Sequence, residues 1–287
     1  MTLLQKGGDS VKKIGFIDHY LHEWHADNMP VWLDEVSNGE MKVCYAWGEI
    51  DSPNEDSLTN KAWADKMNIE LCSSQEEVIE KSDCLMVLSP DNPERHPDLC
   101  RLPLLSGKPT FIDKTFAVGL DDAKQIVEKA KETPFFTCSA LRYDTELKAV
   151  KKADIETIAS RGPGMFDVYV IHMLEPLYML MGKAKRVIAL GIASAPTLFY
   201  DYGNDKNAVL SFFNYDVGFS TAVRYKDGKC TTLSFESEFF KAFTADLMEF
   251  FKTGTPPVRI EETLDIMSML DAGRKAASNR GVWTSIE

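Results

Sequence analysis

The sequence predicts an α/β protein of two parts: a doubly wound parallel sheet, then an α+β domain with an open, mostly antiparallel sheet. From residue 13 to residue 139, short apolar runs alternate with stretches patterned as helices, which is typical of a parallel sheet. The runs 14–17 and 84–88 are apolar without alternation, as strands covered on both faces are. Beyond residue 143 the strand-like runs follow one another closely, which indicates antiparallel neighbours. We therefore place two domains, at 12–142 and 143–287, with the last helices able to pack back on the first domain.

The first domain is predicted to contain six strands joined by helices. One helix, 74–81, follows Ser73 with Glu76 three residues later, which is the pattern of a capping box. A second helix is expected at 120–131. The six strands are expected at 13–18, 42–47, 69–72, 83–89, 109–113 and 134–139.

The second domain is predicted to hold consecutive strands between helices. Asp227-Gly228, which lies between two apolar runs, is a strong signal for a two-residue hairpin. Gly254 and the prolines after it end a helix. The expected helices are 144–152, 171–181, 238–252 and 261–278, and the expected strands are 186–193, 197–202, 208–215, 219–225 and 230–235.

Composition narrows the class of partner. The 287 residues include 32 basic and 44 acidic side chains, and the net charge of −12 repels nucleic acid and anionic lipid. No apolar run approaches the ~20 residues that cross a bilayer, and residues 1–11 lack a signal peptide's apolar segment. The six cysteines are scattered without C-x-x-C, which favours reduced core residues. We expect a cytoplasmic protein that binds neither nucleic acid nor membranes.

Lys114 closes the predicted fifth strand, in the run Asp113-Lys114-Thr115. Ligands of open α/β sheets lie outside the carboxyl ends of the strands, so a lysine at this point faces whatever is bound. A surface lysine at the end of an edge strand is the competing interpretation. Position alone leaves both open.

Five groups of motifs occur in one order along nearly the whole chain. They are Asp83 to Asn92 followed by His96, Gly107-Lys108 with Ile112 to Thr115, Ser139 to Asp144, His172 to Glu175 with Met181-Gly182, and the final segments 243–254 and 261–282. In this order they resemble the glucose-fructose oxidoreductase and inositol dehydrogenase family, the Gfo/Idh/MocA-like dehydrogenases. The resemblance implies a Rossmann-like dinucleotide-binding domain followed by a domain for substrate binding and dimerisation.

The resemblance also implies an NAD(P)-dependent oxidoreductase that transfers a hydride to or from a hydroxyl-bearing, carbohydrate-like small molecule. That hydroxyl loses a proton, so the site needs a base and a positive group. Lys114 and His172 match these catalytic roles, while a core position is the competing interpretation of His172. The residues implied for substrate binding are Arg142, Tyr143, Tyr169 and Glu175. Those implied for cofactor binding are Asp18, His19, Tyr20, Trp47, Ser89, Pro90, Asn92, His96, Asp113 and Lys114.

The same resemblance implies a homo-oligomer that forms through the C-terminal sheet. An open sheet leaves one face that its own helices do not cover, and aromatic side chains there would supply contact area. These aromatics also fit a domain core. They are Phe199, Phe213, Tyr215, Phe219 and Tyr225.

The first strand-to-helix loop departs from the family. Members carry G-x-G-x-x-G there, which lets the backbone approach the pyrophosphate. Here no glycine follows Gly15 in this loop, and Asp18 adds a carboxylate where a negative ligand would come. Trp47 stands about where an acidic residue would hold the ribose hydroxyls. NAD(P) therefore either binds in an altered pose or does not bind.

Two further positions differ from the family. Thr115 replaces the proline that follows the lysine, which can change the local backbone. The carboxylate expected four residues before His172 falls on Val168, and Asp167 lies one residue early. If that stretch is a strand, a one-residue offset turns the side chain to the other face.

Two alternatives stay open. His19, His22 and His25 could bind a divalent metal, although on a helix the first and third diverge by roughly 120°, so only a loop lets all three converge. That site would suit a metal-dependent hydrolase or lyase, whereas the leading prediction assigns no metal. The other alternative is a non-redox ligand-binding or regulatory protein that has lost dinucleotide binding.

Overall fold

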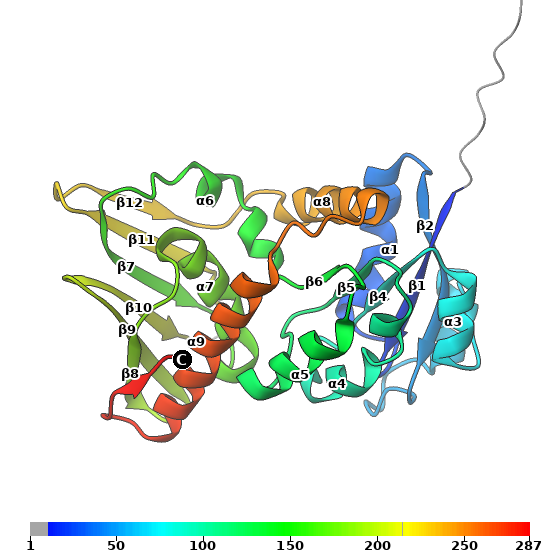
Figure 1. The fold of residues 1–287 in the computed structure, drawn as a ribbon, viewed down its shortest axis with the longest axis horizontal. Helices are drawn as coiled ribbons and strands as arrows, with labels where there is room; N and C mark the ends of the chain where they lie inside the picture. Colours follow the sequence, from blue (N-terminus) through cyan, green and yellow to red (C-terminus); the bar gives the residue numbers. More distant parts are fainter. Residues whose placement is uncertain (1–10, 214) are drawn as a thin grey trace, which may run out of the picture.

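The computed structural model describes residues 11–213 and 215–287, and its two sheets lie side by side (Figure 1). The strands of the first sheet are β1 (Lys12–Asp18), β2 (Met41–Gly48), β3 (Glu70–Leu71), β4 (Cys84–Val87), β5 (Thr110–Ile112) and β6 (Phe135–Phe136). All pair in parallel, in the order β3-β2-β1-β4-β5-β6. The order reverses between β1 and β4, which is where open α/β sheets bind ligands. The predicted Rossmann-like first sheet is confirmed.

Helices cover both faces of this sheet. The helices are α1 (Trp24–Ser37), α2 (Asn60–Met67) and α8 (Phe239–Thr253) on one face, and α3 (Gln75–Lys81), α4 (His96–Leu99) and α5 (Leu120–Ala130) on the other. Phe111 of β5 packs against Phe243 and shares one buried cluster with Trp63, while Ile17 of β1 shares the other cluster with Val78. The chain therefore returns from the second domain, through α8, to cover the first sheet beside α1 (Figure 1).

The helix near residue 74 begins one residue later than predicted. Ser74 is its N-cap and accepts a hydrogen bond from the Glu77 amide at 3.3 Å. The Glu77 carboxylate accepts one from the Ser73 amide at 2.7 Å. The expected capping pair, Ser73 with Glu76, is therefore shifted by one residue.

The second sheet has seven strands in the order β12-β11-β7-β10-β9-β8-β13, and β7–β10 is its one parallel pair among the described residues. Its strands are β7 (Ile155–Gly162), β8 (Arg186–Ile192), β9 (Ala195–Gly203), β10 (Lys206–Phe212), β11 (Ser220–Tyr225), β12 (Cys230–Leu233) and β13 (Thr284–Ser285). The predicted open, mostly antiparallel sheet is confirmed. Strand β7 was not predicted, because Ile155 and Ile158 are three residues apart and do not alternate.

Helices α7 (Phe166–Met181) and α9 (Ile260–Ser278) pack on one face of the second sheet, and the short α6 (Thr145–Ala149) precedes them in the chain. The first of these begins at Phe166, not near residue 171. Asp167 and Val168 therefore lie in the first turn of a helix, and the strand argument for this pair was wrong. Asp167 pairs with Arg274 of α9 at 3.4 Å and does not face His172.

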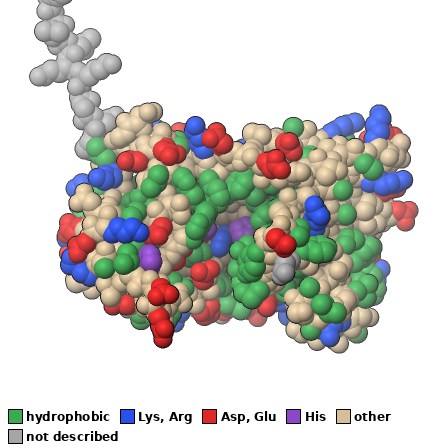
Figure 2. All heavy atoms as spheres, turned by 180° about the vertical axis from the view of Figure 1, so that it is seen from behind, with side chains coloured by type: hydrophobic (Ala, Val, Ile, Leu, Met, Phe, Trp, Pro, Cys, Tyr) green, Lys and Arg blue, Asp and Glu red, His purple; other side chains and the backbone are tan. Residues whose placement is uncertain are grey.

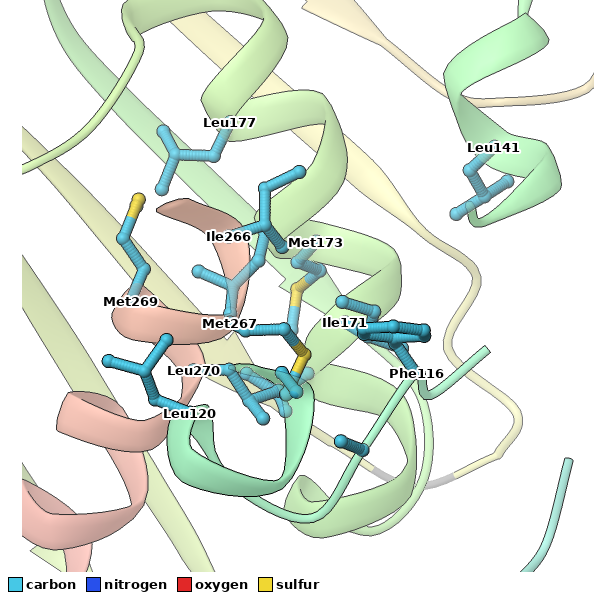
Figure 3. Packing of buried hydrophobic residues seen from close by; sticks show 14 of the residues in the cluster. Phe116, Leu120, Leu141, Ile171, Met173, Leu177, Ile266, Met267, Met269 and Leu270 are labelled. Carbon is cyan, nitrogen blue, oxygen red and sulfur yellow. The ribbon is translucent and has the colours of Figure 1, made fainter. Parts of the chain in front are cut away.

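Helix α9 connects the cores of the two domains. Figure 3 shows Met267 and Leu270 of α9 beside Ile171 of α7, with Phe116 and Leu120 from the first domain next to them. All five side chains belong to one buried cluster. The two domains are therefore packed tightly together, and the cleft between them has fixed walls.

All six cysteines lie in the described part of the chain and are free thiols. Four are buried as predicted, whereas Cys44 is half-buried and Cys230 is exposed. Within residues 11–213 and 215–287, no helix is both long and apolar enough to cross a membrane.

Candidate active site

A cavity of about 470 Å³ lies where the two domains meet. Lys114 from the end of β5 and His172 from α7 both line it. Figure 2 shows this hollow on the molecular surface, with hydrophobic side chains around it and basic and histidine side chains at its floor. Its volume falls in the range of small-molecule sites, about 300–1,000 Å³. The geometric condition for a shared site, that these two groups face one crevice, is therefore met.

Lys114 presents a positive charge to the cavity. The residue is only 8% exposed, and the described residues offer its ammonium no hydrogen-bond or ion-pair partner. Its own amide donates to the neighbouring Asp113 carboxylate at 2.7 Å. The Lys114–Thr115 peptide bond is cis. A desolvated ammonium held in this way stabilises negative charge that develops beside it.

His172 lies across the cavity on the second domain. Its Nδ1 lies 2.7 Å from the Ser139 hydroxyl, which also accepts from the Leu141 amide at 3.3 Å. Burial and the charge of Lys114 hold the pKa of His172 well below its usual value, so the ring is neutral near pH 7. If Nδ1–H donates to Ser139, the lone pair of Nε2 is free to accept a proton.

Lys114 and His172 share the cavity lining with buried acidic side chains that lie at the N-terminus of α1. His25 contacts Asp113 through a very short Nδ1 to Oδ2 approach. Burial acts to raise the pKa of Asp113, but its interaction with His25 outweighs burial, and the pKa is lowered. Burial raises the pKa of Glu23 to about 7, with Asp113 adding to the effect and His25 opposing it.

Glu23 is the N-cap of α1. Its carboxylate accepts from the His25 amide at 2.7 Å and from the Ala26 amide at a shorter distance. Nearby, burial and the charge of Glu23 raise the pKa of Asp18 well above its usual value. One Asp18 oxygen accepts from the His19 amide at 2.6 Å, while the other, Oδ2, is buried and has no hydrogen-bond partner in the described part of the chain.

The loop between β1 and α1 is hydrogen-bonded to the segment that follows β2 and to α2. The Glu49 amide donates to the Asp18 carbonyl at 3.0 Å and the Ile50 amide to the His19 carbonyl at 2.9 Å, so this segment lies alongside the end of β2. The Leu21 amide then donates to Asn60 at 2.9 Å. Neither this loop before Glu23 nor β2 contributes to the cavity lining. The adenosine and pyrophosphate portions of NAD(P) do not fit here in the usual Rossmann pose.

Most of the residues implied for cofactor binding lie outside the cavity. His19 bonds to Glu49 at 2.7 Å, and Arg95 holds the same carboxylate. Tyr20 and Trp47 are half-buried. Three others support the loop after β4, since the Ser89 hydroxyl donates to the Asn92 carbonyl at 3.0 Å and His96 lies between the Leu88 and Phe116 carbonyls at 2.6 and 3.0 Å. Of the ten, the cavity lining includes Pro90, Asp113 and Lys114.

Of the residues implied for substrate binding, one lines the cavity and three do not. Tyr169 lines the cavity beside His172, with ring centroids 5.8 Å apart. Arg142, Tyr143 and Glu175 do not line it. The guanidinium of Arg142 bonds to Glu175 at 2.7 Å and closely contacts Glu262. Both of its terminal nitrogens are therefore paired with carboxylates inside the protein.

The three clustered histidines do not converge. His19 bonds to Glu49, His25 contacts Asp113, and the Nδ1 of His22 accepts from the Leu58 amide at 2.9 Å. Each ring therefore has its own partner. Among the described residues, the one group close enough to share a metal ion is Glu70, Cys72 and Glu77, which contains no histidine and lies near β3.

Sequence reasoning missed the apolar wall of the cavity. Phe239, Phe240 and Phe243 come from the start of α8, and Trp24 comes from the start of α1. Phe240 stacks on Trp32 with ring centroids 4.4 Å apart. The last helices were considered able to pack back on the first domain, and α8 does so, but the sequence did not show that its phenylalanines would line the cavity.

A family model described as "Oxidoreductase family, NAD-binding Rossmann fold" matches residues 50–137 of this chain. No curated protein matches the sequence.

Several solved structures share the fold over nearly the whole chain. The myo-inositol 2-dehydrogenase from Lactobacillus plantarum is 14% identical with a TM-score of 0.79, covering 97% of this chain and 100% of its own. The apo scyllo-inositol dehydrogenase from Lactobacillus casei is 13% identical with a TM-score of 0.78, covering 97% and 99%. The WlbA dehydrogenase from Bordetella pertussis, solved with NADH and UDP-GlcNAcA, is 12% identical with a TM-score of 0.76, covering 97% and 99%. At these identities the likeness establishes the fold.

Proposed function

We propose that this chain, which belongs to the glucose-fructose oxidoreductase and inositol dehydrogenase family, is an NAD(P)-dependent oxidoreductase acting on a hydroxyl-bearing, carbohydrate-like small molecule. The observation that carries the proposal is the shared cavity, because Lys114 and His172 come from different domains and face the same space. A base and a cation are what removal of a hydroxyl proton requires.

Lys114, His172 and the cavity walls have separate roles in this proposal. The nicotinamide supplies or accepts the hydride when it is bound. Neutral His172 accepts the hydroxyl proton, and the Lys114 ammonium stabilises the oxygen as negative charge develops. Tyr169 and the phenylalanines of α8 exclude water from the reacting carbon.

The structural relatives are described as dehydrogenases, which agrees with an enzyme and lends no support to a non-redox regulator. Sugars and cyclitols are the substrates we propose, since two relatives are inositol dehydrogenases. We also propose that two copies pair through the outer face of the second sheet.

The function is tested with purified protein, NAD+ or NADP+ and a panel of sugars, sugar acids and cyclitols, by the absorbance of the reduced nicotinamide. Lys114→Ala should lower kcat/KM by about 10²–10⁴, because a group that contacts the reacting oxygen is lost. Thermal stability should not fall, since this ammonium has no partner among the described residues.

Lys129→Ala is the matched control, because it removes a lysine from the exposed face of α5. It should leave kcat/KM unchanged. Full turnover in Lys114→Ala would remove Lys114 from the chemistry, and no turnover with any dinucleotide would remove the proposed activity.

A further inference from the structure

The N-terminus of α1 already holds a carboxyl group that belongs to the protein. Helix N-termini bind phosphate because their first amides are unpaired and the helix dipole favours negative charge. Here the Glu23 carboxylate accepts from the amides of His25 and Ala26. Glu23 is 8% exposed, so this cap is part of the packed interior. A phosphate at the same point would compete for the same N–H groups.

The surrounding charges also oppose a phosphate. Asp18 from the end of β1 and Asp113 from the end of β5 are both 1% exposed and lie close enough to influence the charge of Glu23 or of each other. His25 is paired with Asp113. The pKa of Asp113 is lowered, so this carboxylate keeps its charge, and in a cleft of low dielectric a doubly charged group beside it is unfavourable.

Glu23, His25 and Asp113 of this corner also line the cavity, but other parts of its lining differ in character. Lys114 brings a positive charge without a partner among the described residues, and Trp24, Phe240 and Phe243 form an apolar aromatic wall. Aromatic rings pack favourably against such walls. A nicotinamide ring therefore meets better complementarity in the cavity than a pyrophosphate meets at α1.

We propose that Glu23 keeps the pyrophosphate away from the N-terminus of α1, so that NAD(P) is held mainly by its nicotinamide end in the interdomain cavity. This inference rests on the proposed use of NAD(P). It also accounts for the missing glycine-rich sequence. If no pyrophosphate binds at the β1–α1 loop, that loop does not need glycines.

Calorimetry with NADH and ADP-ribose tests the inference, because ADP-ribose carries the pyrophosphate without the nicotinamide. For the natural chain, NADH should bind at least about tenfold more tightly than ADP-ribose. Glu23→Ser removes the anion and retains a good N-cap residue. In this variant the affinity for ADP-ribose should rise by about tenfold or more.

Two variants serve as controls. Glu23→Gln keeps an acceptor oxygen at the helix end without the charge, so its gain in ADP-ribose affinity should be smaller, and it carries the test if the serine variant does not fold. Glu76→Ser makes the same change of net charge in the first turn of α3, on an exposed position, and should leave the affinity unchanged.

The outcomes separate the inference from the proposed function. If ADP-ribose binds the natural chain as tightly as NADH does, or if no Glu23 variant gains affinity, the inference is overturned while NADH binding still supports the function. If NADH binds neither the natural chain nor the variants, NAD(P) dependence itself is overturned, and the inference is overturned with it.

Discussion

Burial is the largest cause of the lowered pKa of His172, and two residues from the first domain also contact or influence this ring. Lys114 lowers its pKa through charge repulsion, and Ser139 engages Nδ1. Burial, the largest cause, lowers the pKa as well. Because its pKa is lowered, the imidazole stays neutral at pH 7 and somewhat below it. The neutral ring is the form that can act as a base.

Lys114→Met should therefore raise the pKa of His172 toward its ordinary value of 6.5, since the repelling charge is lost and burial remains. NMR titration of the imidazole protons measures the shift, with Lys129→Met as the control that should not move it. An unchanged or lower pKa would show that Lys114 does not act on this ring.

At this scale, the sequence predicted a shared site for Lys114 and His172 because each stands in a recognisable motif, and both line one cavity. Glu23 stands in no such motif, and its position depends on where α1 begins. Arg142 was expected to bind substrate, yet it lies between Glu175 and Glu262. To predict these ion pairs, one must know that α7 and α9 bring the two carboxylates to Arg142, and a single sequence does not show this.

Arg142 joins three elements, the 3₁₀ turn Ala140–Tyr143, α7 and α9. Arg142→Met should lower the free energy of unfolding by about 3–5 kcal/mol, because Glu175 would remain buried without its partner. Chemical denaturation measures the loss. Arg186, which bonds to Asp201 at 2.8 Å on the surface, provides the control.

Arg186→Met should cost less than about 1 kcal/mol, as exposed ion pairs do. Equal losses in the two variants would contradict a special role for the buried pair.

Elements were predicted well where their patterns are local. The strands of the first sheet have apolar centres, and each of the six expected segments overlaps an observed strand that differs from it mainly at its ends. Strand β7 was missed because its buried positions, Ile155, Ile158, Ser160 and Gly162, include only two large apolar side chains. Its place at the centre of the second sheet comes from its pairing with β10 and β11.

At the scale of the whole molecule, the helices of residues 11–213 and 215–287 leave one broad face of the second sheet uncovered. A row of apolar side chains crosses five neighbouring strands on that face. The row consists of Ile188, Phe199, Val209, Ala159 and Ala222, each paired with the next across the sheet. Phe213 and Tyr215 are exposed nearby, at 51% and 62%, whereas Phe219 lines the cavity and is not available for such contact.

We predict that two copies pair through this row. Val209→Lys places a charge at its centre without entering the core, since Val209 is outside the buried set of β10, and it should convert a dimer to a monomer. Sedimentation over a range of concentrations measures the change.

Val118→Lys, at a 42% exposed position in the first domain, should leave the dimer intact. A natural chain that sediments as a monomer, or a Val209→Lys variant that remains dimeric, would place any assembly on another surface. Because Lys114 and His172 belong to the same copy, monomeric variants should retain an intact cavity.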